Sequence, residues 1–312
     1  MITSKKLIIG GGISGLVWKF YNPDYQIISP EVGGLFAKTH LVWLHDTVET
    51  RKLLTDLGWQ NVDKSTKKSY TGYFYKGWIS DNISNEINLV MIQKKMTDWN
   101  QPLETEFIPK TRDLSLSYPG GFNFMNVLDV DLEEVITRLR KNSNVFKGRV
   151  VEIGKNAVII KPPEGDLIPV KYDHLVTTIP APFFWSSWGT PKEFKYKPIT
   201  NVLTKVRPSV FDDKYEMVYY DNSQLMTRVS HLGGLYAIEF TGVITEDEFK
   251  QNFPDLPIEN YFVIQQGRIF ETELNLPPSD NIIFLGRFAE WKYKITTEFV
   301  VKKTLDYKQL NK

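Results

Sequence analysis

Three glycines near the amino end have the spacing of a phosphate-binding turn. Gly10, Gly12 and Gly15 stand in G-x-G-x-x-G register directly after the apolar residues 7–9. In such a turn the first glycine permits the tight bend, the second lets backbone N–H groups approach a pyrophosphate, and the third lets a helix pack closely. A helix that begins there also directs its positive dipole end towards an anion. The spacing therefore predicts dinucleotide binding.

The flanking residues predict the elements that would position this turn. Apolar side chains recur at helical spacing at Ile13, Leu16, Val17 and Phe20. Asn22-Pro23 should end this helix, and residues 25–29 read as a second strand. A second glycine pair, Gly33-Gly34, follows after a short loop. Strand, turn, helix and strand together form a βαβ unit.

The composition limits the classes of protein to which the chain can belong. With 312 residues, 42% hydrophobic and 24% charged, it fits a globular protein of two interlocked domains. The net charge of +1 gives no general electrostatic attraction to nucleic acid. The absence of cysteine excludes disulfides, thiolate nucleophiles and cysteine-ligated metals. We predict no metal site, no signal peptide and no membrane span, and hence a cytoplasmic protein.

The order of G-x-G-x-x-G, second strand and glycine pair resembles the fingerprint of the glutathione reductase-type FAD flavoproteins. Its amine oxidase, protoporphyrinogen oxidase and UDP-galactopyranose mutase branches share this order. The resemblance implies FAD as the cofactor, and it implies contacts from Gly10, Gly12, Ile13, Ser14, Gly15, Gly33, Gly34 and Leu35. At the position where the family has a ribose-binding glutamate, this chain has Ser29, and Glu31 is the nearest carboxylate.

Two later stretches strengthen the resemblance. Residues 173–182, DHLVTTIPAP, resemble the D-x-V-V-x-T-x-P strand of amine oxidase-like flavoproteins, and the family's adenine-contacting strand matches the backbone around Val150. Residues 282–299 resemble the C-terminal FAD segment of the mutases. There the resemblance implies that Gly286-Arg287 contacts FAD, that Tyr293 contacts the substrate, and that a helix beginning near Ile295 faces the isoalloxazine. The family's Asp-Met pair is replaced by Lys294-Ile295.

Three further side chains are candidates for a role beside the flavin. His40 and His45 lie in a predicted strand that enters a helix, with Asp46 as the expected N-cap and Glu49 completing a capping box. A structural role for either histidine stays open. Arg228 lies in a stretch that resembles a Thr-Arg pair at the mutase flavin, and a solvated strand arginine is the alternative.

The predicted fold is α/β, a Rossmann-like FAD-binding domain interleaved with an antiparallel β-sheet substrate domain. We assign residues 1–72, 120–182 and 276–312 to the FAD-binding domain. Residues 73–119, a hairpin and a helix, and residues 183–275, an antiparallel sheet, form the substrate domain. Within these, residues 145–153 and 157–161 read as a strand and its hairpin partner.

The predicted function is that of an FAD-dependent, amine oxidase-like oxidoreductase. Hydride would pass from a small amine-bearing or nucleotide-linked substrate to flavin N5. A mutase-like, non-redox reaction on a nucleotide sugar and a non-catalytic flavin-binding scaffold remain alternatives. The mutases carry a helical lid between the segments that match residues 99 and 118, where this chain has about 20 irregular residues. The oligomeric state stays open.

Overall fold

The computed structural model describes residues 5–34, 44–80, 85–101, 124–141, 143–190, 192–232, 234–270, 279–292 and 295–310. The chain forms two compact units, each assembled from discontinuous segments. Unit 1 comprises Met1–Thr66, Leu128–Phe194 and Thr272–Lys312, and unit 2 comprises Lys67–Val127 and Lys195–Glu271.

Unit 1 is built on a five-stranded parallel sheet in the order β17-β11-β1-β2-β7. Its strands are β1 (Lys6–Gly12), β2 (Gln26–Gly33), β7 (Val145–Lys147), β11 (His174–Thr177) and β17 (Ile282–Phe284). Leu7 and Ile8 are both fully buried, although they point to opposite faces of the sheet. The parallel sheet is therefore covered on both faces, as its apolar strand sequences require.

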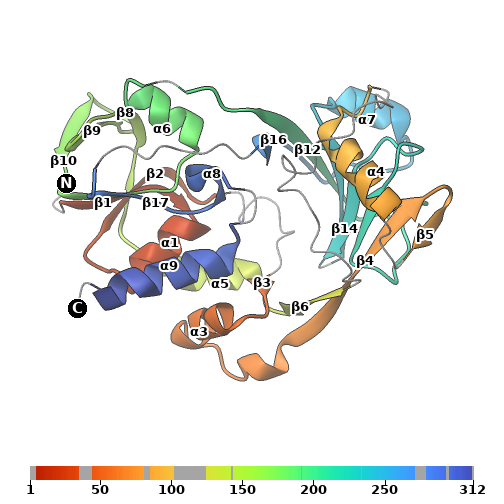
Figure 1. Ribbon diagram of the computed structural model, residues 1–312, viewed down its shortest axis with the longest axis horizontal. Coiled ribbons are helices and arrows are strands. Elements are labelled where there is room, and N and C mark those ends of the chain that lie inside the picture. Colours follow the sequence, from red (N-terminus) through yellow and green to blue (C-terminus); the bar gives the residue numbers. More distant parts are fainter. Residues whose placement is uncertain are drawn as a thin grey trace. The chain divides into compact units, whose positions relative to one another are not determined.

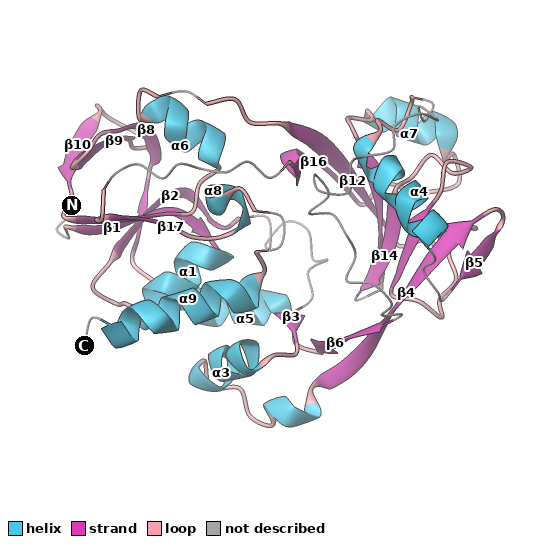
Figure 2. Cartoon of the chain, in the orientation of Figure 1, coloured by secondary structure: helices cyan, strands magenta, loops and turns pink. Residues whose placement is uncertain are grey.

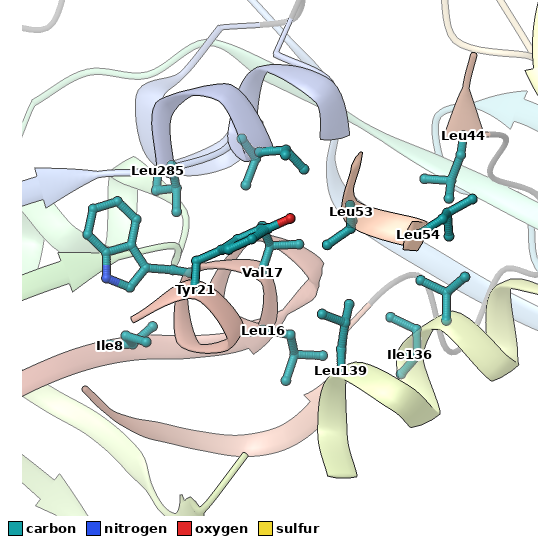
Figure 3. Packing of buried hydrophobic residues seen from close by; sticks show 14 of the residues in the cluster. Ile8, Leu16, Val17, Tyr21, Leu44, Leu53, Leu54, Ile136, Leu139 and Leu285 are labelled. Atoms are coloured by element: carbon teal, nitrogen blue, oxygen red, sulfur yellow. The ribbon is translucent and has the colours of Figure 1, made fainter. Parts of the chain in front are cut away.

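Helices from distant parts of the sequence cover one face of this sheet. They are α1 (Ile13–Tyr21), α5 (Leu132–Lys141) and α9 (Thr297–Leu310), with α3 (Val48–Asp56) packed against them. Figure 1 shows α1, α5 and α9 together beneath β1 and β17. Figure 3 shows Ile8 of β1, Leu16 of α1 and Leu139 of α5 in one buried cluster. The apolar spacing that predicted α1 thus corresponds to a core that α1 shares with α5.

The opposite face carries α6 (Ala181–Ser187), α8 (Arg287–Glu290) and an antiparallel sheet of β8 (Arg149–Ile153), β9 (Ala157–Lys161) and β10 (Ile168–Lys171). The predicted hairpin is confirmed for residues 149–153 and 157–161, but the single strand predicted over residues 145–153 is two strands. The strand breaks at Gly148, so that β7 pairs with β2 and β8 pairs with β9. A Cβ at Gly148 would lie 2.6 Å from Ile160 Cγ2, which explains why the break occurs at a glycine.

Helix α3 begins with a different cap from the predicted one. Thr47, not Asp46, is the N-cap, and its Oγ1 accepts a hydrogen bond from the Thr50 N–H at 3.3 Å. Thr50 Oγ1 accepts from the Thr47 N–H at 3.1 Å and completes the capping box. Asp46 instead binds Arg51.

Replacement of Thr47 with alanine should therefore destabilise unit 1 by about 1 kcal/mol, because a helix N–H loses its acceptor. The free energy of unfolding in urea measures this loss. Thr55→Ala is the control, since Thr55 lies inside the same helix and is exposed. It should have little effect or stabilise slightly, because alanine is the better helix former. Equal losses in the two variants would contradict the cap assignment.

Unit 2 contains a larger sheet with the strand order β16-β12-β15-β14-β13-β4. The strands are β16 (Asn260–Ile269), β12 (Tyr196–Thr204), β15 (Leu235–Thr241), β14 (Arg228–Leu232), β13 (Met217–Tyr220) and β4 (Thr66–Tyr75), with β5 (Trp78–Ser80) and β6 (Phe124–Leu128) beside β4. Pairing from β16 to β13 is antiparallel as predicted, but β4 runs parallel to β13. The sheet is therefore mixed.

Among its described residues, unit 2 also contains the helices α4 (Asn85–Met96) and α7 (Glu246–Asn252). Figure 2 shows the contrast in content between the strand-rich unit 2 and the alternating strands and helices of unit 1. Phe249 of α7 packs into a buried cluster with Phe240 and Ile238 of β15. Within the described ranges, no helix has both the length and the apolar character needed to cross a membrane.

Candidate cofactor and active site

The glycine turn where β1 ends and α1 begins is packed so tightly that most of its positions exclude a side chain. Gly10 has φ +104°, and a Cβ there would lie 2.3 Å from Thr178 Oγ1. Thr178, in the TTIP stretch after β11, donates from Oγ1 to the Ile9 carbonyl at 3.0 Å. A Cβ at Gly15 would lie 2.1 Å from the Gly10 carbonyl oxygen. These glycines allow the turn, the strand and the helix to touch.

Gly12 differs from its neighbours because the space beside it is open. It is the N-cap of α1 with φ −73° and ψ 179°, and it makes no side-chain cap hydrogen bond. A Cβ built there would meet no atom within 4 Å. The first turn of a helix has N–H groups without intrahelical partners, so this opening lies where an anion would be bound.

The second glycine pair lies directly beside this opening. Gly33 is the register partner of Gly12 in the parallel ladder, and a Cβ on Gly34 would lie 3.1 Å from Gly12 Cα. The expected loop between the second strand and the glycine pair does not form. Instead β2 continues through Pro30 to Gly33, with a register shift opposite β1 between Ile9 and Gly11.

The Gly286-Arg287 corner, near the carboxyl end of the chain, also lies beside the first turn of α1. Gly286 has φ +96°, and a Cβ there would lie 2.4 Å from Ser14 Oγ in the first turn of α1. The Gly286 N–H donates to Glu290 Oε1 at 3.1 Å, and Lys303 Nζ lies 3.2 Å from Glu290 Oε2. Glu290 and Lys303 therefore fix the corner, although neither was predicted to do so.

A methyl group at Gly286 should disrupt this corner. Gly286→Ala combines a positive φ with a clash against Ser14, so we expect a loss of about 2–3 kcal/mol in the free energy of unfolding and weaker cofactor binding. Gly165→Ala is a matched control, because Gly165 has φ +94° but no atom within 4 Å of its hypothetical Cβ. In the control, the free energy of unfolding should fall only by the cost of placing alanine at a positive φ, about 1 kcal/mol. Urea unfolding of both variants measures the difference.

The candidate ribose contacts lie within β2. Ser29 is 5% exposed, and its Oγ donates to the Glu31 carbonyl at 2.5 Å. The Glu31 side chain is exposed. Val150 is buried on β8, and the preceding Gly148 donates its N–H to the Ser29 carbonyl at 3.2 Å. The strand predicted to contact adenine therefore begins beside Ser29.

The remaining candidates of unit 1 are only partly described. Leu35, His40 and Tyr293 lie outside the described residues. Ile295 packs against the core cluster just before α9. His45 ends the short strand β3 (Leu44–His45), and its Nδ1 lies 2.9 Å from Glu298 Oε1 in the first turn of α9. The sequence pattern gave no signal for Glu298, because its partner is 253 positions away.

Arg228 of unit 2 is neither free in solvent nor isolated. Its Nη2 donates to Glu239 Oε2 at 2.6 Å, and the other carboxylate oxygen accepts from Arg268. Arg228 and Glu239 are cross-strand partners on β14 and β15. The side chain of Arg228 is 24% exposed, whereas that of Glu239 is 2% exposed.

Burial alone would raise the pKa of Glu239, but the attraction of Arg228, Arg268 and Lys95 lowers this pKa to about 2. Lys95 Nζ also lies 4.5 Å from the centre of the Tyr219 ring. The rings of Tyr219 and Tyr73 stack with centroids 6.0 Å apart. One face of the sheet therefore combines stacked aromatic rings with an arginine held by a buried carboxylate.

Comparison with known proteins gives structural relatives only. No family model matches the chain, and no curated protein matches its sequence. Reduced UDP-galactopyranose mutase aligns over 99% of this chain and 94% of its own, with a TM-score of 0.59 and 10% identity. Cyclohexylamine oxidase from Brevibacterium oxydans aligns over 99% and 98%, with a TM-score of 0.61 and 12% identity. A double mutant of putrescine oxidase aligns over 98% of each chain, with a TM-score of 0.56 and 12% identity.

These likenesses confirm the predicted fold class. The parallel sheet of unit 1 and the mixed sheet of unit 2 together match the fold of these oxidases and of the mutase over nearly the whole chain. At 10–12% identity the comparison establishes the fold alone.

Proposed function

We propose that this protein binds FAD without a covalent link and that the diphosphate lies at Gly12. The observation that carries this proposal is the open space at Gly12, with Gly34 and Gly286 both close to the start of α1. A dinucleotide diphosphate needs backbone amides that it can approach without meeting side chains, and the three glycines meet this need. The proposed FAD ligands are Gly10, Gly12, Ile13, Ser14, Gly15, Gly33, Gly34, Gly286 and Arg287.

We further propose that the protein is an amine oxidase-like oxidoreductase. Bound FAD would supply the hydride acceptor, which no side chain of this cysteine-free chain can provide. The fold shared with putrescine oxidase and cyclohexylamine oxidase supports an amine-bearing small substrate. In this proposal the chain binds and orients the amine and excludes water around it.

A mutase-like reaction on a nucleotide sugar is the second candidate, because the mutase aligns as completely as the oxidases do. Arg228 suits either reaction. Its guanidinium, held at one end by Glu239, could bind the phosphate of a nucleotide sugar or help to position an oxidase substrate.

The test begins with purification of the full chain and identification of any extracted cofactor. FAD in about 1:1 ratio, or its uptake on reconstitution, is the expected result. Protein that cannot be loaded with FAD would refute the cofactor proposal. Anaerobic mixing with putrescine and cyclohexylamine then tests for flavin bleaching, which we expect for an oxidase.

Two other outcomes would redirect the assignment. Activity on a UDP-sugar only after dithionite reduction would favour the mutase reaction. A bound flavin that neither amines nor UDP-sugars affect would favour a non-catalytic scaffold.

A further inference from the structure

A hydrogen bond joins two elements of unit 1 that are distant in the sequence. His45 lies at the end of β3, and Glu298 is the second residue of α9. Their side chains meet at 2.9 Å, from Nδ1 to Oε1, with 37% of the histidine and 16% of the glutamate side chain exposed. The carboxylate is thus largely shielded, while the imidazole remains accessible.

This pair lies at the carboxyl edge of the parallel sheet. The chain leaves β17 at Phe284, turns at Gly286 beside Ser14, and returns in α9, whose Val300 and Val301 are buried in the core. A helix that packs back on a sheet after a strand runs opposite to that strand, so its first turn lies at the edge where the strands end. Ligands of open α/β sheets bind at that edge.

The hydrogen bond to Glu298 determines which ring nitrogen of His45 carries a proton. Burial would raise the pKa of Glu298, but the hydrogen bond and the attraction from His45 help to hold this pKa below its usual value. Near neutral pH Glu298 is then a carboxylate and can only accept, so Nδ1 must carry the shared proton. In neutral His45 this leaves Nε2 with its lone pair.

We propose that Glu298 is a positioning residue that holds His45 as the Nδ1–H tautomer, so that Nε2 accepts a proton from the substrate ammonium group. This inference rests on the proposed amine oxidation. An ammonium group has no lone pair, so hydride cannot leave the adjacent carbon until the nitrogen has lost a proton.

The proton transfer is balanced in atoms and charge. The substrate N–H bond breaks, the electron pair stays on nitrogen, and a new bond forms between Nε2 and the proton. The positive charge moves from the substrate to the imidazolium, which the Glu298 carboxylate stabilises through Nδ1–H.

The other charged groups on the packed segments are mostly engaged with one another. On the β3–α3 segment they are Asp46, Glu49, Arg51 and Lys52, and on the first half of α9 they are Lys302 and Lys303. Arg51 binds Asp46 and Asp63, Lys52 binds Asp56, and Lys303 binds Glu290. Within the described part of the chain, Glu298 is therefore the carboxylate paired with His45.

The first test measures the tautomer directly, without reference to activity. In full-length protein with ¹⁵N-labelled histidine, His45→Gln identifies the His45 signals among those of the 4 histidines. We expect a protonated Nδ1 and an unprotonated Nε2 in the neutral wild-type side chain. In Glu298→Gln this pattern should shift towards a mixture, whereas the exposed control Glu133→Gln should leave it unchanged. A wild-type Nε2–H tautomer, or no change in Glu298→Gln, would overturn the proposal.

The second test follows flavin reduction by putrescine and cyclohexylamine as a function of pH. At pH 7 we expect reduction to be about 100-fold slower in His45→Gln and about tenfold slower in Glu298→Gln. For both variants, the difference in reduction rate from the wild type should become smaller near pH 10.5, where an alkylamine is already about half deprotonated. A purely structural loss would persist at that pH.

The outcomes separate this inference from the proposed function. If amines reduce the wild-type flavin but His45→Gln has the same pH profile, the inference fails and the proposed function stands. If no amine reduces the FAD-loaded wild type, the proposed function fails and the proton-accepting role fails with it.

Discussion

Gly12→Val should fold normally and fail to retain FAD. The backbone of Gly12 has an ordinary negative φ, and the space for a side chain is open, so the protein itself tolerates the substitution. A diphosphate placed against the first turn of α1 would meet the valine methyl groups. We expect the affinity for FAD to fall by about 100-fold or more, a loss of roughly 3 kcal/mol or more.

Equilibrium titration of the cofactor-free protein with FAD measures this effect, and urea unfolding checks the fold. Gly12→Ala should give an intermediate loss. Gly154→Ala is the matched control, because a Cβ there makes only an ordinary 3.4 Å contact with Ala157. Stoichiometric FAD in Gly12→Val would show that the diphosphate lies elsewhere.

The second large effect concerns stability and lies in unit 2. Glu239→Gln keeps the shape of the side chain but removes the carboxylate that Arg228 and Arg268 share. The change of charge at a buried ion pair should destabilise the protein by about 3–5 kcal/mol. The free energy of unfolding in urea measures this loss. The control is Glu259→Gln, which affects only an exposed pair with Lys205.

The same variant should change the response to acid. The folded-state pKa of Glu239 is about 2, below the value of about 4.3 expected for an unfolded chain. The stability from this group is therefore present above pH 4.3 and is lost as the pH falls towards 2. Wild-type protein should lose more stability across this window than Glu239→Gln. Parallel pH curves for the two proteins would contradict the assignment.

Much of the fold was predictable because local pattern and tertiary packing agree. The strand-turn-helix start follows directly from the apolar spacing and from the spacing of the glycines. The errors arose where tertiary contacts decide between local alternatives. Asp46 is a good N-cap by residue type, but Arg51 engages it and Thr47 takes the cap. The parallel pairing of β4 with β13 likewise depends on strands distant in the sequence.

The candidate site was predictable in its glycines but not in its supporting residues. Gly10 and Gly15 have distinctive spacing, and the structure shows why each must lack a side chain. Thr178 occupies the threonine position of the D-x-V-V-x-T-x-P stretch. Glu290 and Glu298 act through partners on the next turn or far away in the chain, so no local motif marks them. Glu239 was not predicted either, although it is the single charged residue in the strand LYAIEFT, where a buried charge requires a partner.

The uninterrupted course of β2 has a consequence for how a dinucleotide would be taken up. Gly12 and Gly33 are neighbours in a ladder of backbone hydrogen bonds, so their conformations are set when the sheet folds. The entropy of ordering this backbone is then lost before any ligand arrives. Association with such a preorganised surface requires little rearrangement. We therefore expect exchange of one dinucleotide molecule for another to proceed while the sheet stays intact.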